Sequence, residues 1–90
     1  MKLSKRHYYS CSTSYERTGR KRGCKVTICY TNIKNQYYFL VRKLSVNDKN
    51  DTFFNSCWKD MIYETEEDCI ASCEKFIDDV FYDNTEVLNH

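Results

Sequence analysis

Long apolar runs are missing from this sequence, including at its start. A membrane-spanning helix needs roughly 20 consecutive apolar residues, and no segment approaches that length, so no membrane insertion is expected. Residues 1–7 also lack the apolar stretch of a signal peptide. If the protein is secreted, its signal must have been removed, and the evidence for secretion must come from other residues.

Motifs typical of metal sites and of catalysis are missing as well. The sequence has no Cys-x-x-Cys or His-x-x-x-His pair, which a zinc site typically uses. No Cys/His pair, no paired carboxylates and no phosphate loop stand out. We therefore expect no bound metal, no cofactor and no enzymatic activity.

Proline is absent and glycine occurs twice, whereas cysteine occurs six times in 90 residues. A chain of this length supports one domain, residues 1–90, with an apolar core close to marginal. Three disulfide bonds, each typically worth about 2–4 kcal/mol, would compensate for that. An even cysteine count in a small chain indicates an oxidising compartment, so we expect a secreted, extracellular protein. The expected disulfide cysteines are Cys11, Cys24, Cys29, Cys57, Cys69 and Cys73.

Charge is divided unevenly along the chain. Residues 1–43 hold eleven Lys or Arg and one acid, whereas residues 44–90 hold three Lys and twelve acids. The two halves therefore carry net charges of +10 and −9. Either the folded molecule is electrically two-ended, or the halves neutralise one another.

Local patterns predict a loop followed by a β-hairpin. Residues 1–35 carry little periodicity and contain a basic run with both glycines at 17–25, which predicts an exposed loop. Two aromatic and β-branched runs, 37–44 and 52–58, flank a polar turn and predict the hairpin. Because the hairpin is apolar on both faces, one face should pack on a helix and the other on the N-terminal loops.

The clearest local signal is a helix that begins after Thr65. Thr65 and the three acids that follow it resemble a capping box, with negative charge where the helix dipole favours it. Steps of three and four residues place an apolar face on Cys69, Cys73, Phe76 or Ile77, and Val80. The two cysteines lie one turn apart and could ligate a metal, but we expect each to be bridged to a different distant segment.

Three further segments are predicted to lie at the surface. Residues 1–10 and 83–90 are expected to be flexible tails of the domain. The tripeptide Asn50-Asp51-Thr52 is an N-glycosylation acceptor within the predicted turn.

Residues 57–73, CWKDMIYETEEDCIASC, resemble the C-terminal third of Kunitz-type (pancreatic trypsin inhibitor-like) domains. Tyr63 lies six positions before Cys69, where that family usually has Phe, and a Cys-x-x-x-Cys pair follows. The chain departs from the family because 49–55 lacks a cysteine and Asn55-Ser56 replaces the usual Gly-Gly. It is similar to the divergent Kunitz-like proteins of tick saliva and venoms.

The resemblance implies a small disulfide-rich α+β fold: a Kunitz-like twisted β-hairpin packed on a C-terminal helix, with irregular N-terminal loops. It also implies a disulfide pairing. In that pairing Cys73 is bonded to Cys11, Cys57 to Cys24 or Cys29, and Cys69 to the remaining thiol.

In Kunitz inhibitors the residue after the loop cysteine enters the S1 pocket of a serine protease. With Cys24 as that cysteine the residue is Lys25, which suits a pocket with an acidic floor; with Cys29 it is Tyr30. Basic residues surround Cys24, so we favour Lys25 and predict inhibition of a trypsin-like serine protease, such as tryptase or a clotting protease. The predicted protease-binding residues are Lys25, Arg22, Cys24 and Val26.

Other interpretations of the basic run at 17–25 stay open. It is alternatively a solvated loop, or a site for heparin or another polyanion. Nucleic acid is not an expected partner, because aromatic residues are not interleaved with the run and the expected compartment is wrong. The resemblance also implies a second functional class, an ion-channel modulator of the Kunitz-like toxin type without protease inhibition.

Overall fold

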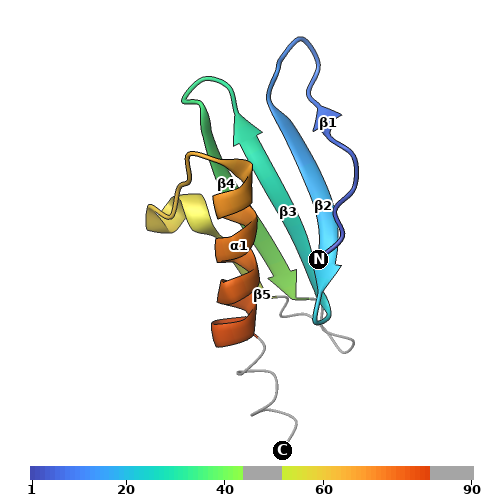
Figure 1. The fold of residues 1–90 in the computed structure, drawn as a ribbon, viewed down its shortest axis with the longest axis vertical. Coiled ribbons are helices and arrows are strands. Elements are labelled where there is room, and N and C mark those ends of the chain that lie inside the picture. The colour runs from blue at the N-terminus through green and yellow to red at the C-terminus, as the bar shows by residue number, and fades with distance from the viewer. Residues whose placement is uncertain (44–51, 82–90) are drawn as a thin grey trace, which may run out of the picture.

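Five consecutive strands and one helix form the part of the chain that the structure describes, residues 1–43 and 52–81 of a computed structural model. The strands form one antiparallel sheet in the order of the sequence (Figure 1). They are β1 (His7–Tyr8), β2 (Tyr15–Lys21), β3 (Cys24–Thr31), β4 (Gln36–Lys43) and β5 (Thr52–Asn55). A 3₁₀ turn η1 (Ser56–Lys59), the helix α1 (Glu66–Phe76) and a π-helical turn η2 (Ile77–Phe81) follow.

The basic run that predicted a loop forms the hairpin of β2 and β3. Lys21 pairs with Cys24, so Arg22 and Gly23 make a two-residue turn, and both have positive φ (51° and 80°). Positive φ at both central residues matches the right-handed twist of the flanking strands, which is why such turns suit hairpins. The expectation of irregular N-terminal loops is therefore wrong.

Helix α1 begins where its sequence predicts. The Thr65 side chain accepts a hydrogen bond from the backbone N–H of Asp68 at 3.1 Å, as an N-cap does. Cys69, Cys73 and Ile77 are fully buried, which confirms the predicted inward face up to that point. Val80 is 42 % exposed, so its predicted place on that face is wrong, because the π-helical turn η2 breaks the spacing of the preceding helix.

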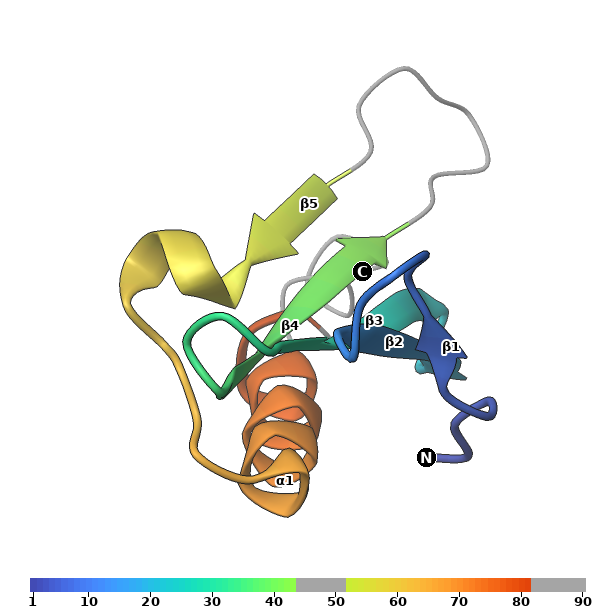
Figure 2. The same ribbon diagram turned by 90° about the horizontal axis from the view of Figure 1, so that it is seen from above.

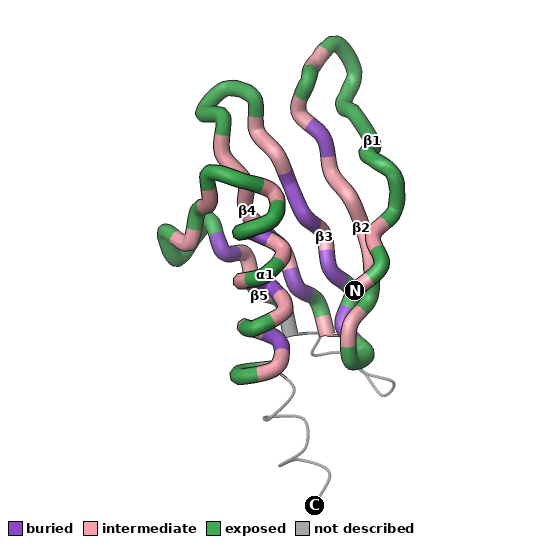
Figure 3. The backbone as a smooth tube through the Cα atoms, in the orientation of Figure 1, coloured by how far each residue is buried: buried purple, intermediate pink, exposed green. Residues whose placement is uncertain are grey.

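The core lies between α1 and the face of the sheet that the helix covers (Figure 2). Residues of β3 alternate between that core and the opposite side, and burial alternates with them over residues 24–28 (Figure 3). The backbone N–H of Phe39 donates to the buried Ser56 hydroxyl at 2.9 Å, which ties β4 to η1. The fully or nearly fully buried core residues are Cys24, Val26, Ile28, Phe39, Val41, Cys69, Cys73 and Ile77.

The disulfide-rich, Kunitz-like fold expected from the sequence is wrong. All six cysteines lie in the described ranges and none is bonded to another. Most of the N-terminal half forms strands of a five-stranded sheet, whereas the expected fold has irregular loops in residues 1–35 and a single hairpin after them. Apolar side chains buried between the sheet and the helix stabilise the fold, which is the role that the sequence predicted for disulfides. Local sequence patterns do not reveal this burial because it depends on contacts between distant segments.

The predicted hairpin between β4 and β5 is confirmed, because Leu40 pairs with Asn55 and Arg42 with Phe53. Its outward face is not covered by N-terminal loops, so that expectation is wrong. Its turn, with the possible glycosylation site at Asn50, and the tail 83–90 lie outside the described residues.

The N-terminal segment lies along β2, where the Ser4 N–H donates a hydrogen bond to the Thr18 carbonyl at 2.7 Å. None of the described helices is long and apolar enough to cross a membrane.

Candidate anion-binding surface

The side of the sheet opposite α1, here called the outer face, carries three cations in register. Arg20 on β2 pairs with Lys25 on β3, and Lys25 pairs with Arg42 on β4. All three side chains are exposed, whereas Cys24 and Val26, the neighbours of Lys25, are buried against the helix. Strand alternation therefore places these three residues, the basic row, on one surface.

A shallow groove lies at one end of this row. It has a volume of about 210 Å³ and is lined by residues of three adjacent strands. The lining combines two cations, a hydroxyl group, an aliphatic side chain and an aromatic ring. These residues are Lys25, Thr27, Leu40, Arg42 and Phe53, and they define the basic groove.

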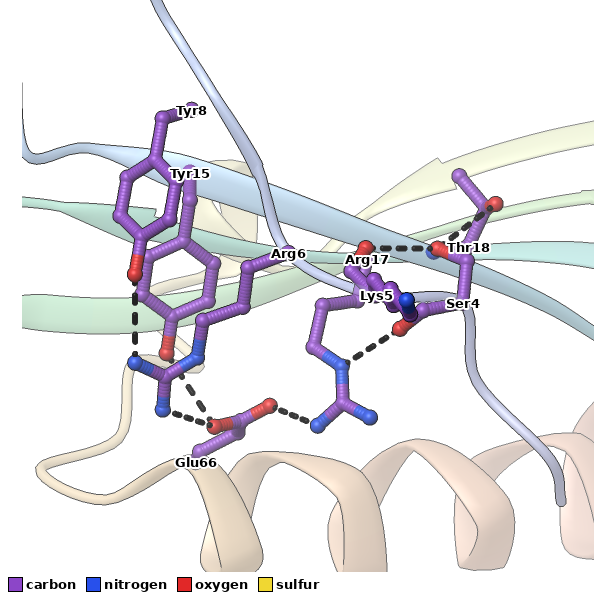
Figure 4. A network of polar contacts seen from close by, with 8 residues as sticks. All are labelled: Ser4, Lys5, Arg6, Tyr8, Tyr15, Arg17, Thr18 and Glu66. Carbon is purple, nitrogen blue, oxygen red and sulfur yellow. Dashed lines mark hydrogen bonds and ion pairs between the residues drawn. The ribbon is translucent and has the colours of Figure 1, made fainter.

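On the face of the sheet that α1 covers, basic side chains of β2 form ion pairs with acidic side chains of α1. Glu66 accepts hydrogen bonds from Arg17 at 2.6 Å and from the Tyr15 hydroxyl at 3.1 Å, and Arg6 lies 3.3 Å away (Figure 4). Burial alone would raise the pKa of Glu66. The hydrogen bonds from Arg17 and Tyr15 and the charges of Arg17 and Arg6 outweigh that effect and lower its pKa.

A second acidic group lies toward the end of the helical segment. Asp78 accepts a hydrogen bond from Arg22 at 2.6 Å, and Lys21 lies 3.6 Å from Asp78 and 3.8 Å from Glu74. The hydrogen bond from Arg22 lowers the pKa of Asp78, although burial opposes the shift. The opposite charges of the two halves of the chain thus meet on the helix-covered face.

This division of charge separates the outer face from the rest of the molecule. Arg20 and Lys25 have no ion-pair partner among residues 1–43 and 52–81. The ion pairs on the helix-covered face support the second expectation about the uneven charge, that the two halves neutralise one another. The halves neutralise one another across the helix interface, whereas Arg20 and Lys25 on the outer face have no such ion pair among the described residues.

We expect Glu66→Gln to lower the free energy of unfolding by about 1–3 kcal/mol at neutral pH, because it weakens charge-assisted hydrogen bonds in a mostly buried site. The lowered pKa means that this stabilisation is complete above the ordinary glutamate pKa of about 4.3 and is lost as pH falls through the folded-state value. Urea unfolding of both proteins between neutral and acidic pH measures the difference.

Glu67→Gln is the matched control, since Glu67 lies beside Glu66 in the first turn and is exposed. Its free energy of unfolding should stay within about 0.5 kcal/mol of the wild type. Equal losses for the two variants, or a Glu66→Gln loss that persists at acidic pH, would contradict the assigned role of Glu66.

The structure does not bring the four predicted protease-binding residues to one surface. Lys25 lies on the outer face and Arg22 in the turn, where it is hydrogen-bonded to Asp78. Cys24 and Val26 are buried in the core. Lys25 pairs with a strand on each side, so it belongs to the middle of a sheet and not to an exposed loop.

Tyr30, the competing specificity residue, lies on the helix-facing side, 4.8 Å from the Tyr37 ring between centroids. The pairing expected for the six cysteines is wrong. Cys24, Cys69 and Cys73 are unbonded members of the core, Cys29 is also buried, and Cys11 and Cys57 are exposed.

Four residues of the basic groove were not predicted as site residues: Thr27, Leu40, Arg42 and Phe53. One signal was available, because Cys24, Val26 and Ile28 alternate with Lys25 and Thr27 at the period of a half-buried strand. That alternation places Lys25 on the solvent side. It does not reveal the register of β3, β4 and β5. That register brings Arg42 and Phe53, which lie 17 and 28 positions after Lys25, into the groove.

Comparisons with protein-family models, with curated proteins and with solved structures return no match. Inference about function therefore depends on the geometry of the outer face.

Proposed function

We propose that this protein binds a linear polyanion on the outer face of its sheet. The observation that carries the proposal is the alignment of Arg20, Lys25 and Arg42 across three neighbouring strands. Neighbouring strands lie about 4.8 Å apart, so the backbones of the basic row span roughly 10 Å. A fixed cluster of one charge raises the local concentration of oppositely charged ligands and increases their association rate.

The distribution of acids supports this choice of face. Among the outward-facing positions of the described strands, Glu16 is the only acid, and it lies four residues before Arg20 on β2. At about 3.4 Å per residue, that separation is roughly 14 Å, beyond the Debye length of about 8 Å in physiological salt. An anionic ligand on the basic row would therefore meet little repulsion from the strands.

The test is salt-dependent binding of two probes, a heparin-derived oligosaccharide and a 12-nucleotide oligo(dT), measured at about 50 mM salt and above. We expect at least one probe to bind, and we expect the double variant Arg20→Glu/Lys25→Glu to weaken that binding at least about ten-fold because two contacts become repulsive.

Lys75→Glu is the control, because Lys75 is an exposed cation on α1, which lies on the other side of the sheet. It should leave the affinity within about two-fold of the wild type, since a distant charge is screened. Failure of both probes to bind, or equal losses for the outer-face and helix variants, would overturn the proposal.

Inhibition of a trypsin-like protease through Lys25 and modulation of an ion channel stay predictions of the sequence resemblance. An inhibitory loop must present its backbone to the protease, whereas the backbone of Lys25 is paired with β2 and β4. No geometric feature of the described residues favours either activity over polyanion binding.

A further inference from the structure

Two exposed aromatic side chains lie next to the basic row. Phe53 pairs with Arg42 across β4 and β5 and lines the basic groove. Its ring packs edge-on against Trp58 of η1, with centroids 5.8 Å apart and planes at 63°. Phe53 is 45 % exposed and Trp58 is 73 % exposed, so much of their ring surface contacts solvent. Such surface on a small protein marks a candidate interaction site.

Trp58 also borders a second groove on the same face. This groove has a volume of about 340 Å³, and the basic side chain of Lys34 is part of its lining. Lys34 lies between β3 and β4, at the opposite end of these strands from Lys25. Leu40 of the basic groove pairs with Asn55 of the second groove, so the two grooves are neighbours. The second groove is lined by Thr31, Lys34, Gln36, Tyr38, Asn55, Cys57, Trp58 and Ile62.

The outer face therefore offers cations at both ends, with Phe53 beside the basic row and Trp58 beside the second groove. Lys25 and Thr31 are six positions apart on β3, a distance of roughly 20 Å at about 3.4 Å per residue. The surface is long enough for an extended ligand of several repeating units.

We propose that the polyanion is single-stranded nucleic acid, with phosphates on the basic row and bases stacked on Phe53 and Trp58. This inference rests on the proposed function and adds the ligand class. A single strand carries phosphates and unstacked planar bases, so it uses both the cations and the rings of this face. A sulfated glycan has no planar bases, and a duplex keeps its bases stacked inside, so neither engages the aromatic pair in this way.

Two features of the sequence disfavour nucleic acid as a partner. One is that aromatic residues are not interleaved with the basic run, but the fold brings Phe53 and Trp58 to the basic row from a later segment of the chain. The other is an extracellular compartment inferred from disulfides, and none of the cysteines is bonded. The first therefore does not apply to the folded chain, and the second loses the disulfides on which it was based.

Trp58 is the only tryptophan in the protein, so its fluorescence reports directly on this site. We expect oligo(dT) to quench that emission on binding, and the heparin oligosaccharide to leave it nearly unchanged. Phe53→Ala should weaken oligo(dT) binding at least about five-fold, the lower end of the range for one stacked base, and should change heparin binding less than two-fold. Fluorescence anisotropy of labelled probes measures the affinities.

Two further variants separate stacking from folding. Trp58→Phe keeps a ring for stacking and should retain affinity within about three-fold, whereas Trp58→Ala should lose at least about five-fold. Tyr8→Ala removes a ring that is 50 % exposed and lies on the other side of the sheet, beside Tyr15, and it should not change binding. Thermal unfolding of each variant reports whether it is folded.

The outcomes distinguish the two proposals. Heparin binding without oligo(dT) binding, or oligo(dT) binding that is unaffected by Phe53→Ala and Trp58→Ala, would overturn the nucleic-acid inference and leave polyanion binding intact. Equal affinity for duplex and single strand would also overturn it. Failure of every polyanion to bind would overturn both.

Discussion

Phe39→Ala is expected to lower the free energy of unfolding by about 3–5 kcal/mol, the range for removing a buried phenylalanine. Phe39 is fully buried on β4, with ring centroids 5.8 Å from Phe54, 5.7 Å from Phe76 and 6.2 Å from Tyr63. Its ring therefore packs against β5, against α1 and against the segment between η1 and α1. Small domains have a total stability of about 5–15 kcal/mol, so this variant should lose a large part of the stability of the fold.

Urea unfolding followed by circular dichroism measures the effect. Phe39→Leu keeps the core largely filled and should cost less, which leaves a folded protein to measure. Ile33→Ala, at a residue that is 89 % exposed, is the control and should change stability by less than about 0.5 kcal/mol. Similar stabilities for Phe39→Ala and Ile33→Ala would show that the core does not lie between the sheet and α1.

The second large effect concerns thiol reactivity. We expect the native protein to contain six free thiols, of which the exposed Cys11 and Cys57 react quickly and the four buried ones react only on unfolding. The thiolate is the reactive form, and burial disfavours it. Burial raises the pKa of Cys29 to about 11 and of Cys73 to about 12, and it also raises the pKa values of Cys24 and Cys69.

A thiol reagent such as DTNB, added at mildly alkaline pH to protein purified without reductant, gives the count and the rates. Cys11→Ser should remove half of the fast phase and leave the slow phase unchanged. Mass spectrometry after alkylation in denaturant should find six modified cysteines. Fewer than six, or peptides joined by sulfur, would restore the disulfide-based interpretation.

Elements with strong local signals were predictable. The capping residue Thr65 sets the start of α1, because its hydroxyl and the acids after it act within one turn. The aromatic runs of β4 and β5 likewise indicate a hairpin from their composition alone. Val80 shows the limit of such patterns, since helical spacing no longer holds once the chain enters the π-helical turn.

The N-terminal strands were missed because their residues have two interpretations. Glycine and clustered positive charge usually indicate a solvated loop. Here Gly23 completes a tight turn, and Gly19 lies in β2 where an added Cβ would lie 2.7 Å from the Lys2 carbonyl oxygen. Arg17 and Lys21 face the helix and are paired there with acids. These partners lie about 50 residues or more further along the chain, so local patterns do not show that the two charges are neutralised.

The sequence by itself determined the helix start, the later hairpin and the contrast of charge between the two halves, because each depends on neighbouring residues or on counting. Only the tertiary structure decided which positive charges are neutralised, which thiols are buried and which aromatic rings lie beside Lys25. These properties follow from strand register and from the face that α1 covers. Both are set by contacts between distant segments, and a shift of one residue in register would reverse the side on which each strand residue lies.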